Sequence, residues 1–363
     1  MFNRLLRAFF PAGEARQGEA TAAVAEARAL ADANRPAEAI ELLGTHLSRH
    51  PEDAEGRFLR GTLLLEMERT AEALPDLQRA CREKPGEQRY LHNLAMAHWT
   101  RGDIATATAL CDKALAMGDF RPAHILRAKI DLPGEDYLEL MARMHQHIRP
   151  ATYVEIGVNT GQSLQLVRPE TRAIGVDPAP KLAAPPPAGH TVYAETSDAF
   201  FARHDVVADL GGRRIDMAFI DGMHHFEFAL RDFINIERLA RRDSVVLLHD
   251  CYPLDASSAA REPSGEHEPS TQFWSGDVWR LVLILKKYRP DLHFRTLGVP
   301  PTGLGMILNL DPGSRVLSDR LESIVEEFKA ADYATIEGRK SEALNLASGQ
   351  WEAVRKLLDE RPR

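Results

Sequence analysis

The sequence has few cysteines, no excess of positive charge and no long hydrophobic run, and each absence excludes a class of protein. Its three cysteines among 363 residues form neither a disulfide framework nor a zinc-binding spacing. This suits a reducing compartment, so we expect a cytoplasmic protein. A net charge of -8 argues against a nucleic-acid partner, because phosphate binding needs clustered lysine and arginine. No stretch reaches the roughly 18 consecutive apolar residues of a transmembrane segment.

The chain is long enough for two domains, and its composition changes near residue 131. We predict an N-terminal tail over residues 1–19, a helical repeat domain over 20–130, an α/β domain over 131–312 and a C-terminal helical extension over 313–363. The apolar residues of the tail are interrupted by Arg4 and Arg7, which disfavours a signal peptide. A weak interfacial helix, packing onto the next helix and disorder all remain open for it.

Small residues recur every 34 positions in the first half of the chain. Ala27, Gly61 and Ala95 share this spacing. Further sets with the same step are Ala37, Ala71 and Ala105; Ala39, Ala73 and Ala107; Leu43, Leu77 and Cys111; and Pro51 and Pro85. The period, with small residues where paired helices touch, resembles the tetratricopeptide repeat. The resemblance implies a concave face that binds a protein partner; a rigid spacer or a dimerisation element is the alternative.

The second half alternates short β-rich runs with helical patterns, which predicts a parallel sheet. We expect strands near residues 152–156, 172–176, 191–194, 215–220, 244–249, 292–297 and 304–310. The last two are joined by a segment too short for a crossover helix, so they should form an antiparallel hairpin at one edge. The proline-rich segment 178–189 should replace a helix by a loop. The C-terminal extension over residues 313–363 should pack on one domain or support a homo-oligomer.

One constellation in this half carries most of the functional information. A buried strand leads into Glu155-x-Gly157-x-x-x-Gly161, and the next strand ends in Asp177. Loops at the carboxyl ends of adjacent parallel strands face one crevice, which would hold a nucleoside with its ribose hydroxyls on Asp177. A dinucleotide would need the spacing Gly-x-Gly-x-x-Gly for its pyrophosphate. The spacing here favours a nucleoside cofactor without one.

This constellation resembles the class I S-adenosylmethionine-dependent methyltransferases. The resemblance implies a Rossmann-like α/β fold with a seven-stranded methyltransferase sheet, preceded by the all-α repeat domain. It implies contacts between S-adenosylmethionine and Glu155, Gly157, Asn159, Gly161, Asp177, Ser197, Asp198 and Asp221. Ser197 and Asp198 follow the third strand, where the family meets the adenine edge; they could equally cap the next helix.

A second motif, Asp221-Gly-Met-His224, follows the fourth strand, and His249-Asp250 ends the fifth. This pattern resembles macrocin-type sugar O-methyltransferases and cephalosporin-hydroxylase-like proteins. The resemblance implies that His224 is the general base, with Asp221 and Asp250 beside it, and that these two carboxylates bind Mg²⁺. His225 is the neighbouring alternative for the base. His249 stands where some metal-dependent relatives have a second acid, so a metal-free site is the alternative.

A long polar loop over residues 255–276 follows the fifth strand and could cover the acceptor site. Trp274 at its end could stack on a sugar or aromatic acceptor, whereas Trp279 fits the buried face of the next helix.

Taken together, these patterns predict a methyltransferase that modifies a hydroxyl group of a small molecule or glycan and binds a partner through its repeats. The alternative is a repeat scaffold whose methyltransferase-like domain is catalytically silent. A nicotinamide oxidoreductase is disfavoured by the glycine spacing.

Overall fold

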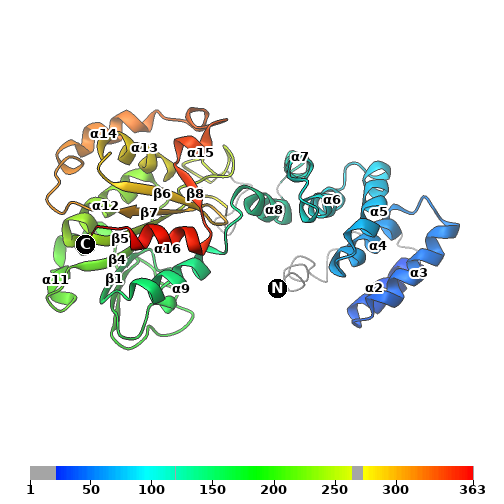
Figure 1. Ribbon diagram of the computed structural model, residues 1–363, viewed down its shortest axis with the longest axis horizontal. Helices are drawn as coiled ribbons and strands as arrows, with labels where there is room; N and C mark the ends of the chain where they lie inside the picture. The colour runs from blue at the N-terminus through cyan, green and yellow to red at the C-terminus, as the bar shows by residue number, and fades with distance from the viewer. Residues whose placement is uncertain (1–21, 119, 264–272, 363) are drawn as a thin grey trace. The chain divides into compact units, whose positions relative to one another are not determined.

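The computed structural model describes residues 22–118, 120–263 and 273–362, which fall into two compact units, Met1–Ile130 and Asp131–Arg363 (Figure 1). The predicted N-terminal tail lies outside the described residues, as does part of the predicted loop over 255–276. None of the described helices is long and apolar enough to cross a membrane.

The first unit consists of helices that pack in consecutive pairs. They are α2 (Ala22–Asp32), α3 (Pro36–Arg49), α4 (Ala54–Glu66), α5 (Thr70–Glu83), α6 (Gln88–Thr100), α7 (Ile104–Leu115) and α8 (Arg121–Asp131). Two of the predicted sets of small residues are buried: Ala27, Gly61 and Ala95, and Ala39, Ala73 and Ala107. The third set, Ala37, Ala71 and Ala105, is exposed, so its predicted place at a helix contact is wrong. A Cβ on Gly61 would lie 2.7 Å from the side chain of Leu77 on the paired helix. The 34-residue period therefore reports close helix packing, as expected.

The second unit is built on one mixed sheet. Its strands are β1 (Thr152–Ile156), β2 (Arg172–Val176), β3 (His190–Tyr193), β4 (Ile215–Ile220), β5 (Ala240–His249), β6 (His293–Gly298), β7 (Leu304–Leu308) and β8 (Leu346–Ser348). The order across the sheet is β3-β2-β1-β4-β5-β7-β6-β8. Strands β3, β2, β1, β4 and β5 are parallel, and β7 is antiparallel to both β5 and β6. The predicted α/β class and the hairpin are confirmed.

The sheet has eight strands, so the predicted number of seven is wrong. The extra strand, β8, comes from the C-terminal segment and pairs in parallel with β6. The β6–β7 hairpin is therefore not at the edge of the sheet. Only three residues form β8, and a segment that short carries no recognisable alternation of polar and apolar residues. The same C-terminal segment supplies α14 (Leu321–Lys329), α15 (Lys340–Ala343) and α16 (Trp351–Asp359).

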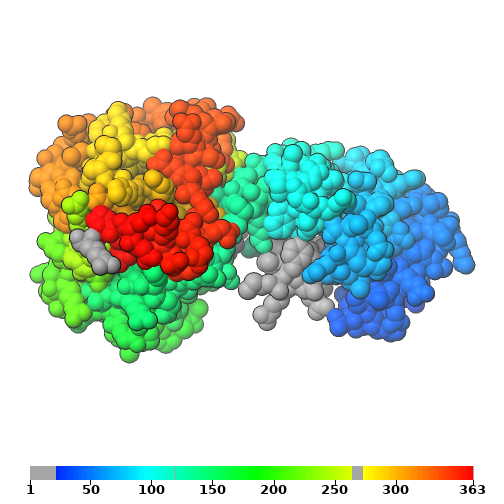
Figure 2. Space-filling view, viewed as in Figure 1, coloured from blue at the N-terminus to red at the C-terminus, as the bar shows by residue number. Residues whose placement is uncertain are grey.

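Two hydrophobic layers cover the sheet because successive strand residues point to opposite faces. Tyr153 of β1 packs in the layer that contains α9 (Tyr137–Ile148) and α16, which lie side by side in Figure 1. Val154 packs in the opposite layer, with α12 (Phe226–Leu239), α13 (Trp279–Tyr288) and α14. Figure 2 shows α16 in red on the surface of this unit. The C-terminal segment is thus an integral part of the sheet domain.

The connections between strands bring several loops to one edge of the sheet. Between β2 and β3 there is no helix, as predicted for the proline-rich segment. Between β3 and β4 lie α10 (Ser197–Arg203) and α11 (Val206–Asp209). The carboxyl ends of β1, β4 and β5 are neighbours, and the residues that follow them are Gly157, Asp221 and Asp250.

Candidate functional site

The loop after β1 is pressed against the loop after β4. Gly157 has a φ of 87°, and a Cβ there would lie 1.9 Å from the backbone oxygen of Asp221. The N–H of Asp221 also donates to the carbonyl of Ile156 at 2.8 Å. Only glycine fits this position, because its φ and the lack of space both exclude a side chain. The ends of β1 and β4 are therefore joined by direct backbone contact.

Asp177 holds the glycine loop in place. Its Oδ2 accepts hydrogen bonds from the backbone N–H groups of Val158 (3.0 Å) and Asn159 (2.8 Å). Its Oδ1 accepts from the N–H of Ala179 at 2.7 Å. A carboxylate has about four lone-pair positions, so one acceptor position is left for a hydroxyl donor. Asp177 is partly exposed, so that position can be reached from solvent.

Glu155, the first residue of the predicted cofactor motif, is fully buried beneath the loop. Its Oε1 accepts from the hydroxyl of Ser163 at 2.7 Å, and its Oε2 accepts from that of Tyr153 at 2.8 Å. Burial raises the pKa of Glu155 to about 8. In this geometry the side chain supports the start of the short helical turn η1 (Leu164–Leu166) rather than facing the crevice.

The proline-rich segment 178–189 lies against the glycine loop. The N–H of Lys181 donates to the carbonyl of Asn159 at 2.8 Å, and that of Ala183 to the carbonyl of Thr160 at 3.0 Å. A Cβ on Gly161 would lie 2.9 Å from the side chain of Leu182. This segment, which contains no helix, therefore packs against the glycine loop and supports it.

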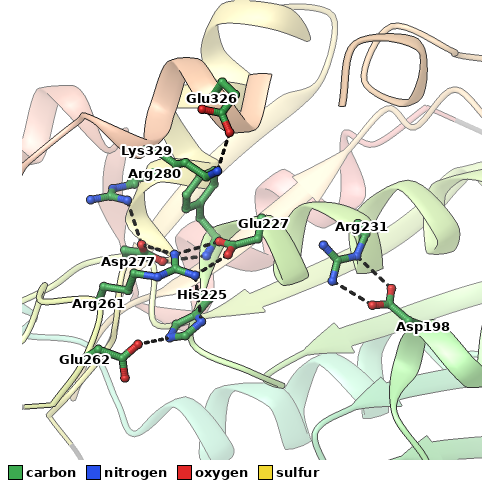
Figure 3. A network of polar contacts seen from close by, with 11 residues as sticks. Asp198, His225, Glu227, Arg231, Arg261, Glu262, Asp277, Arg280, Glu326 and Lys329 are labelled. Carbon is green, nitrogen blue, oxygen red and sulfur yellow. Dashed lines mark hydrogen bonds and ion pairs between the residues drawn. The ribbon is translucent and has the colours of Figure 1, made fainter. Parts of the chain in front are cut away.

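The two candidates after β3 have separate partners. Ser197 is near Asp232, a buried carboxyl on α12, whose pKa burial raises to about 7. Asp198 receives two hydrogen bonds from Arg231, at 2.9 and 2.8 Å (Figure 3). The N-cap of α10 is Thr196, which accepts from the N–H of Ala199 at 3.3 Å. Neither candidate is the cap, and the Asp198 carboxylate is already engaged.

The motifs after β4 and β5 meet at His224. Its Nε2 lies 3.1 Å from Asp250 Oδ2 and 3.8 Å from Asp221 Oδ1. On the other side of the ring, Nδ1 is 3.1 Å from the carbonyl oxygen of Trp274. The structure thus brings the three predicted catalytic residues together, with the imidazole between a carboxylate and a backbone acceptor.

His249 occupies the space between the two carboxylates. Its Nδ1 lies 3.2 Å from Asp221 Oδ1 and 3.3 Å from Asp250 Oδ2. Burial disfavours a charged imidazole, but the two carboxylates outweigh it and raise the pKa of His249 well above its usual value. Burial likewise opposes ionisation of Asp250, yet the charge of His249 lowers the pKa of that carboxyl below its ordinary range. The pair is therefore held as imidazolium and carboxylate.

Two further residues belong to this cluster and were missed by the sequence analysis. Thr302 donates its hydroxyl to Asp250 Oδ1 at 2.6 Å, and the ring of Tyr137 lies 4.4 Å from that of His249. Burial, with the charges of Asp221 and Asp250, raises the pKa of Tyr137 above its ordinary value. Thr302 comes from the β6–β7 turn and Tyr137 from α9, so no local pattern links either residue to the motifs.

The segment after β5 packs on His224. The ring of Trp274 lies 4.9 Å from the imidazole, and a Cβ on Gly276 would lie 1.9 Å from the backbone oxygen of His224. Trp279 is buried, as expected for the face of α13. His225 points elsewhere: its Nδ1 lies 3.1 Å from Arg261.

Arg261 ties this segment to the start of α12 (Figure 3). Its guanidinium donates to Glu227 and to Asp277, with 2.9 Å to an oxygen of each. Asp277 is buried, accepts a hydrogen bond from the N–H of Phe226 at 2.7 Å and also pairs with Arg280 at 2.9 Å. The network fixes the position of the segment that carries Trp274.

The donor set fits Mg²⁺ poorly. Among the described residues, one group could hold a metal ion, with atoms of Asp221, His224 and Asp250 within 4.8 Å of one another. Mg²⁺ prefers oxygen ligands, whereas this group offers an imidazole nitrogen as its third donor. The ring of His249 also lies between the two carboxylates, with Nδ1 3.2 Å from Asp221 and 3.3 Å from Asp250, and occupies space there.

Comparisons with known proteins match a segment in each half of the chain. Residues 154–251 match a family model described as a methyltransferase domain, and residues 24–88 and 59–122 match one described as a tetratricopeptide repeat. No curated protein sequence matches the chain significantly.

Several solved structures are similar to parts of the chain. A fragment of MamA from Desulfovibrio magneticus RS-1 is 18% identical, with 31% of this chain and 63% of that chain covered and a TM-score of 0.30. The O-methyltransferase TomG from Streptomyces achromogenes, solved with SAM, is 16% identical, with 48% and 80% covered and a TM-score of 0.36. YrrB, a tetratricopeptide repeat protein, is 21% identical, with 34% and 60% covered and a TM-score of 0.27. The chain spans less than two thirds of the MamA fragment and of YrrB.

The chain therefore combines tetratricopeptide repeats over residues 24–122 with a methyltransferase domain over residues 154–251.

Proposed function

We propose that the second unit binds S-adenosylmethionine and methylates a hydroxyl group of a small-molecule or glycan acceptor. The observation that carries this proposal is the position of His224, whose Nε2 faces Asp250 at 3.1 Å beside the glycine loop of a methyltransferase domain. A hydroxyl acceptor needs a base, and a histidine held by a carboxylate at a strand end supplies one.

The residues around the crevice fit a nucleoside cofactor. Gly157 and Gly161 adopt positive φ angles of 87° and 81° that shape the loop, and Asp177 retains one acceptor position for a ribose hydroxyl. Asn159 has a φ of 44° and an exposed side chain at the tip of the same loop. When bound, S-adenosylmethionine supplies a methyl group activated by its sulfonium. We assign Glu155 and Asp198 supporting positions, because their carboxylates are engaged within the protein.

The proposed base works through its two nitrogen atoms. Nδ1 faces the carbonyl of Trp274 and Nε2 faces Asp250, so each ring nitrogen has an acceptor; His224 would act as a base once Nε2 has given up its proton. Nε2 would then take the proton of the acceptor hydroxyl. The oxygen of that hydroxyl would gain the methyl group as the bond from the methyl carbon to sulfur breaks and the sulfur leaves as a neutral thioether. Asp250 and, more distantly, Asp221 stabilise the imidazolium that forms. His249 keeps Asp250 ionised, so no step of this mechanism uses a metal ion.

The surface beside His224 suits an acceptor with an apolar ring face. Met223, the residue before His224, is 55% exposed, and Trp274, whose ring lies 4.9 Å from that of His224, is partly exposed. Aromatic and thioether groups pack well on the faces of sugars and aromatic rings. This supports a sugar or aromatic hydroxyl as the methylated group, while the tetratricopeptide repeats bind a protein partner.

Calorimetric titration with S-adenosylmethionine tests the proposal directly. We expect the wild type to bind and Asp177→Ala to lose binding, because the glycine loop and the ribose position both depend on this carboxylate. Asp205→Asn is the matched control, since Asp205 also accepts a backbone hydrogen bond, from Ala208 at 3.1 Å, but caps α11. A wild type without affinity for the cofactor would sink the enzyme proposal and favour the repeat scaffold.

A further inference from the structure

The turns within the three helix pairs place three residues in the left-handed backbone conformation. Asn34, Glu68 and Gly102 are 34 residues apart, and their φ angles are 61°, 61° and 79°. Asparagine and glycine adopt this conformation readily, whereas glutamate rarely does. The equivalent positions carry residue types that suit this conformation, whereas Glu68 does not. A glutamate at such a position suggests that its side chain has a function.

Glu68 lines a cavity between the second and third helix pairs. The cavity has a volume of about 440 Å³ and is lined by Leu65, Glu68, Thr70, Trp99 and Thr100. Leu65 and Trp99 occupy equivalent positions in consecutive repeats, because they are 34 residues apart. The cavity is therefore formed by repeat geometry, with an indole on one side. Its volume lies within the range of small-ligand pockets, roughly 300–1,000 Å³.

The Glu68 carboxylate has no counterion within the described part of the chain. It is exposed, and no hydrogen bond or ion pair of its side chain occurs among those residues. The adjacent Arg69 is engaged by both oxygens of Glu72, at 2.7 Å each, so it does not neutralise Glu68. A free carboxylate beside an indole and two threonine hydroxyls forms an acceptor-rich pocket with an apolar wall.

We propose that this cavity binds an arginine side chain of a protein partner. The guanidinium would pair with Glu68 and lie against the ring of Trp99, while its aliphatic stem contacts Leu65. Arginine fits because its planar cation both stacks on aromatic rings and donates to carboxylates. An aliphatic side chain would gain no attraction from the carboxylate, and an acidic one would be repelled. The inference is independent of the proposed methyl transfer.

An array of short random peptides, probed with the full-length protein, tests this inference. We expect the bound peptides to be enriched in arginine, and replacement of that arginine by its neutral isostere citrulline to weaken binding by about tenfold or more. Affinities can be measured by fluorescence anisotropy with one selected peptide. If the bound peptides showed no enrichment in arginine, or an enrichment in lysine alone, the proposal would be overturned.

Two variants separate recognition from stability. Glu68→Asn carries the residue found at position 34, so we expect its Tm to be equal to or above that of the wild type while peptide binding falls about tenfold or more. Glu38→Gln is the matched control, because Glu38 is the residue equivalent to Glu72 in the preceding helix pair and is engaged by Arg35, away from Glu68; its peptide affinity should stay within about twofold. Unchanged binding by Glu68→Asn would exclude this cavity as the arginine site.

Discussion

His224 Nε2 lies 3.1 Å from Asp250 Oδ2, although the two residues come from different motifs. The contact arises because β4 and β5 are adjacent and parallel, so the loops after them share one edge of the sheet. The carboxylate orients the imidazole and can stabilise a proton on Nε2. This relationship connects the fold to the proposed chemistry.

Replacing His224 should remove turnover and leave cofactor binding intact. We expect His224→Ala to lower kcat by about 10²- to 10⁴-fold, the usual contribution of a general base. Its affinity for S-adenosylmethionine should remain unchanged, as measured by calorimetry. His225→Gln is the matched control, because its ring contacts Arg261, and its kcat should fall by less than about tenfold. Equal losses in the two variants would move the base assignment away from His224.

The hydroxyl of Thr302 should matter for the ionised Asp250. Thr302→Val removes a donor at 2.6 Å from a buried carboxylate and keeps the shape of the side chain. We expect the free energy of unfolding to fall by about 1–3 kcal/mol, the cost of an unsatisfied buried acceptor. Urea unfolding measures this loss in Thr302→Val and in Thr302→Ser. Serine retains the hydroxyl, so the free energy of unfolding should fall less in that variant. A valine variant as stable as the wild type would contradict the role of this bond.

The parts of the fold that were predictable have local signals. The 34-residue spacing of Ala27, Gly61 and Ala95 records helix contacts within each repeat, and the short turn after β6 requires an antiparallel hairpin. The glycine loop and the motif after β4 also lie within single stretches of sequence. Each of these patterns is either periodic or confined to a short stretch of sequence, so it can be recognised without knowing the rest of the fold.

The parts that were not predictable depend on contacts between distant residues. Asp198 was expected at the adenine edge, but its carboxylate meets Arg231 on another helix. Thr302 and Tyr137 reach the catalytic cluster from the β6–β7 turn and α9. His249 was noticed only as a departure from an acidic position; its place between two carboxylates became evident in three dimensions.

Because Gly157 has a close backbone contact, its replacement by alanine should destabilise the protein more than replacement of a glycine with the same φ and no such contact. Gly189 has a φ of 86°, against 87° for Gly157, but a Cβ there would meet no atom within 4 Å. Gly189→Ala should therefore cost only the left-handed strain, about 1–2 kcal/mol. Gly157→Ala should cost clearly more and abolish cofactor binding. Urea unfolding and calorimetry measure both effects; equal costs would mean that the β1 and β4 loops can separate freely.

Chelation should leave activity unchanged. His249 is charged and lies against Asp221 and Asp250, so the carboxylates already have a cationic partner. We expect the rate of methyl transfer to be the same before and after dialysis against EDTA, and the same with added Mg²⁺. Loss of activity in EDTA that Mg²⁺ restores would reinstate the metal-dependent alternative. Calorimetry with S-adenosylmethionine in EDTA controls for indirect loss of the cofactor site.

Burial of Glu155 should make the stability of the domain fall as pH rises. The pKa of this carboxyl is raised from 4.5 to about 8, so the folded protein holds a proton that the unfolded chain releases. Between these two values the folded state binds more protons, and the free energy of unfolding must decrease with increasing pH. The decrease begins near pH 4.5, levels off above pH 8 and amounts to no more than about 5 kcal/mol.

Glu155→Gln isolates this contribution because glutamine has nearly the same shape and does not titrate. Histidines and other shifted groups titrate equally in both proteins, so the difference between their unfolding free energies reports Glu155 alone. We expect the glutamine variant to gain stability relative to the wild type as the pH is raised from 5 to 8, measured by urea unfolding across this range. Parallel curves would mean that Glu155 ionises near its ordinary pKa. The hydroxyls of Ser163 and Tyr153 would then stabilise its charge enough to offset burial.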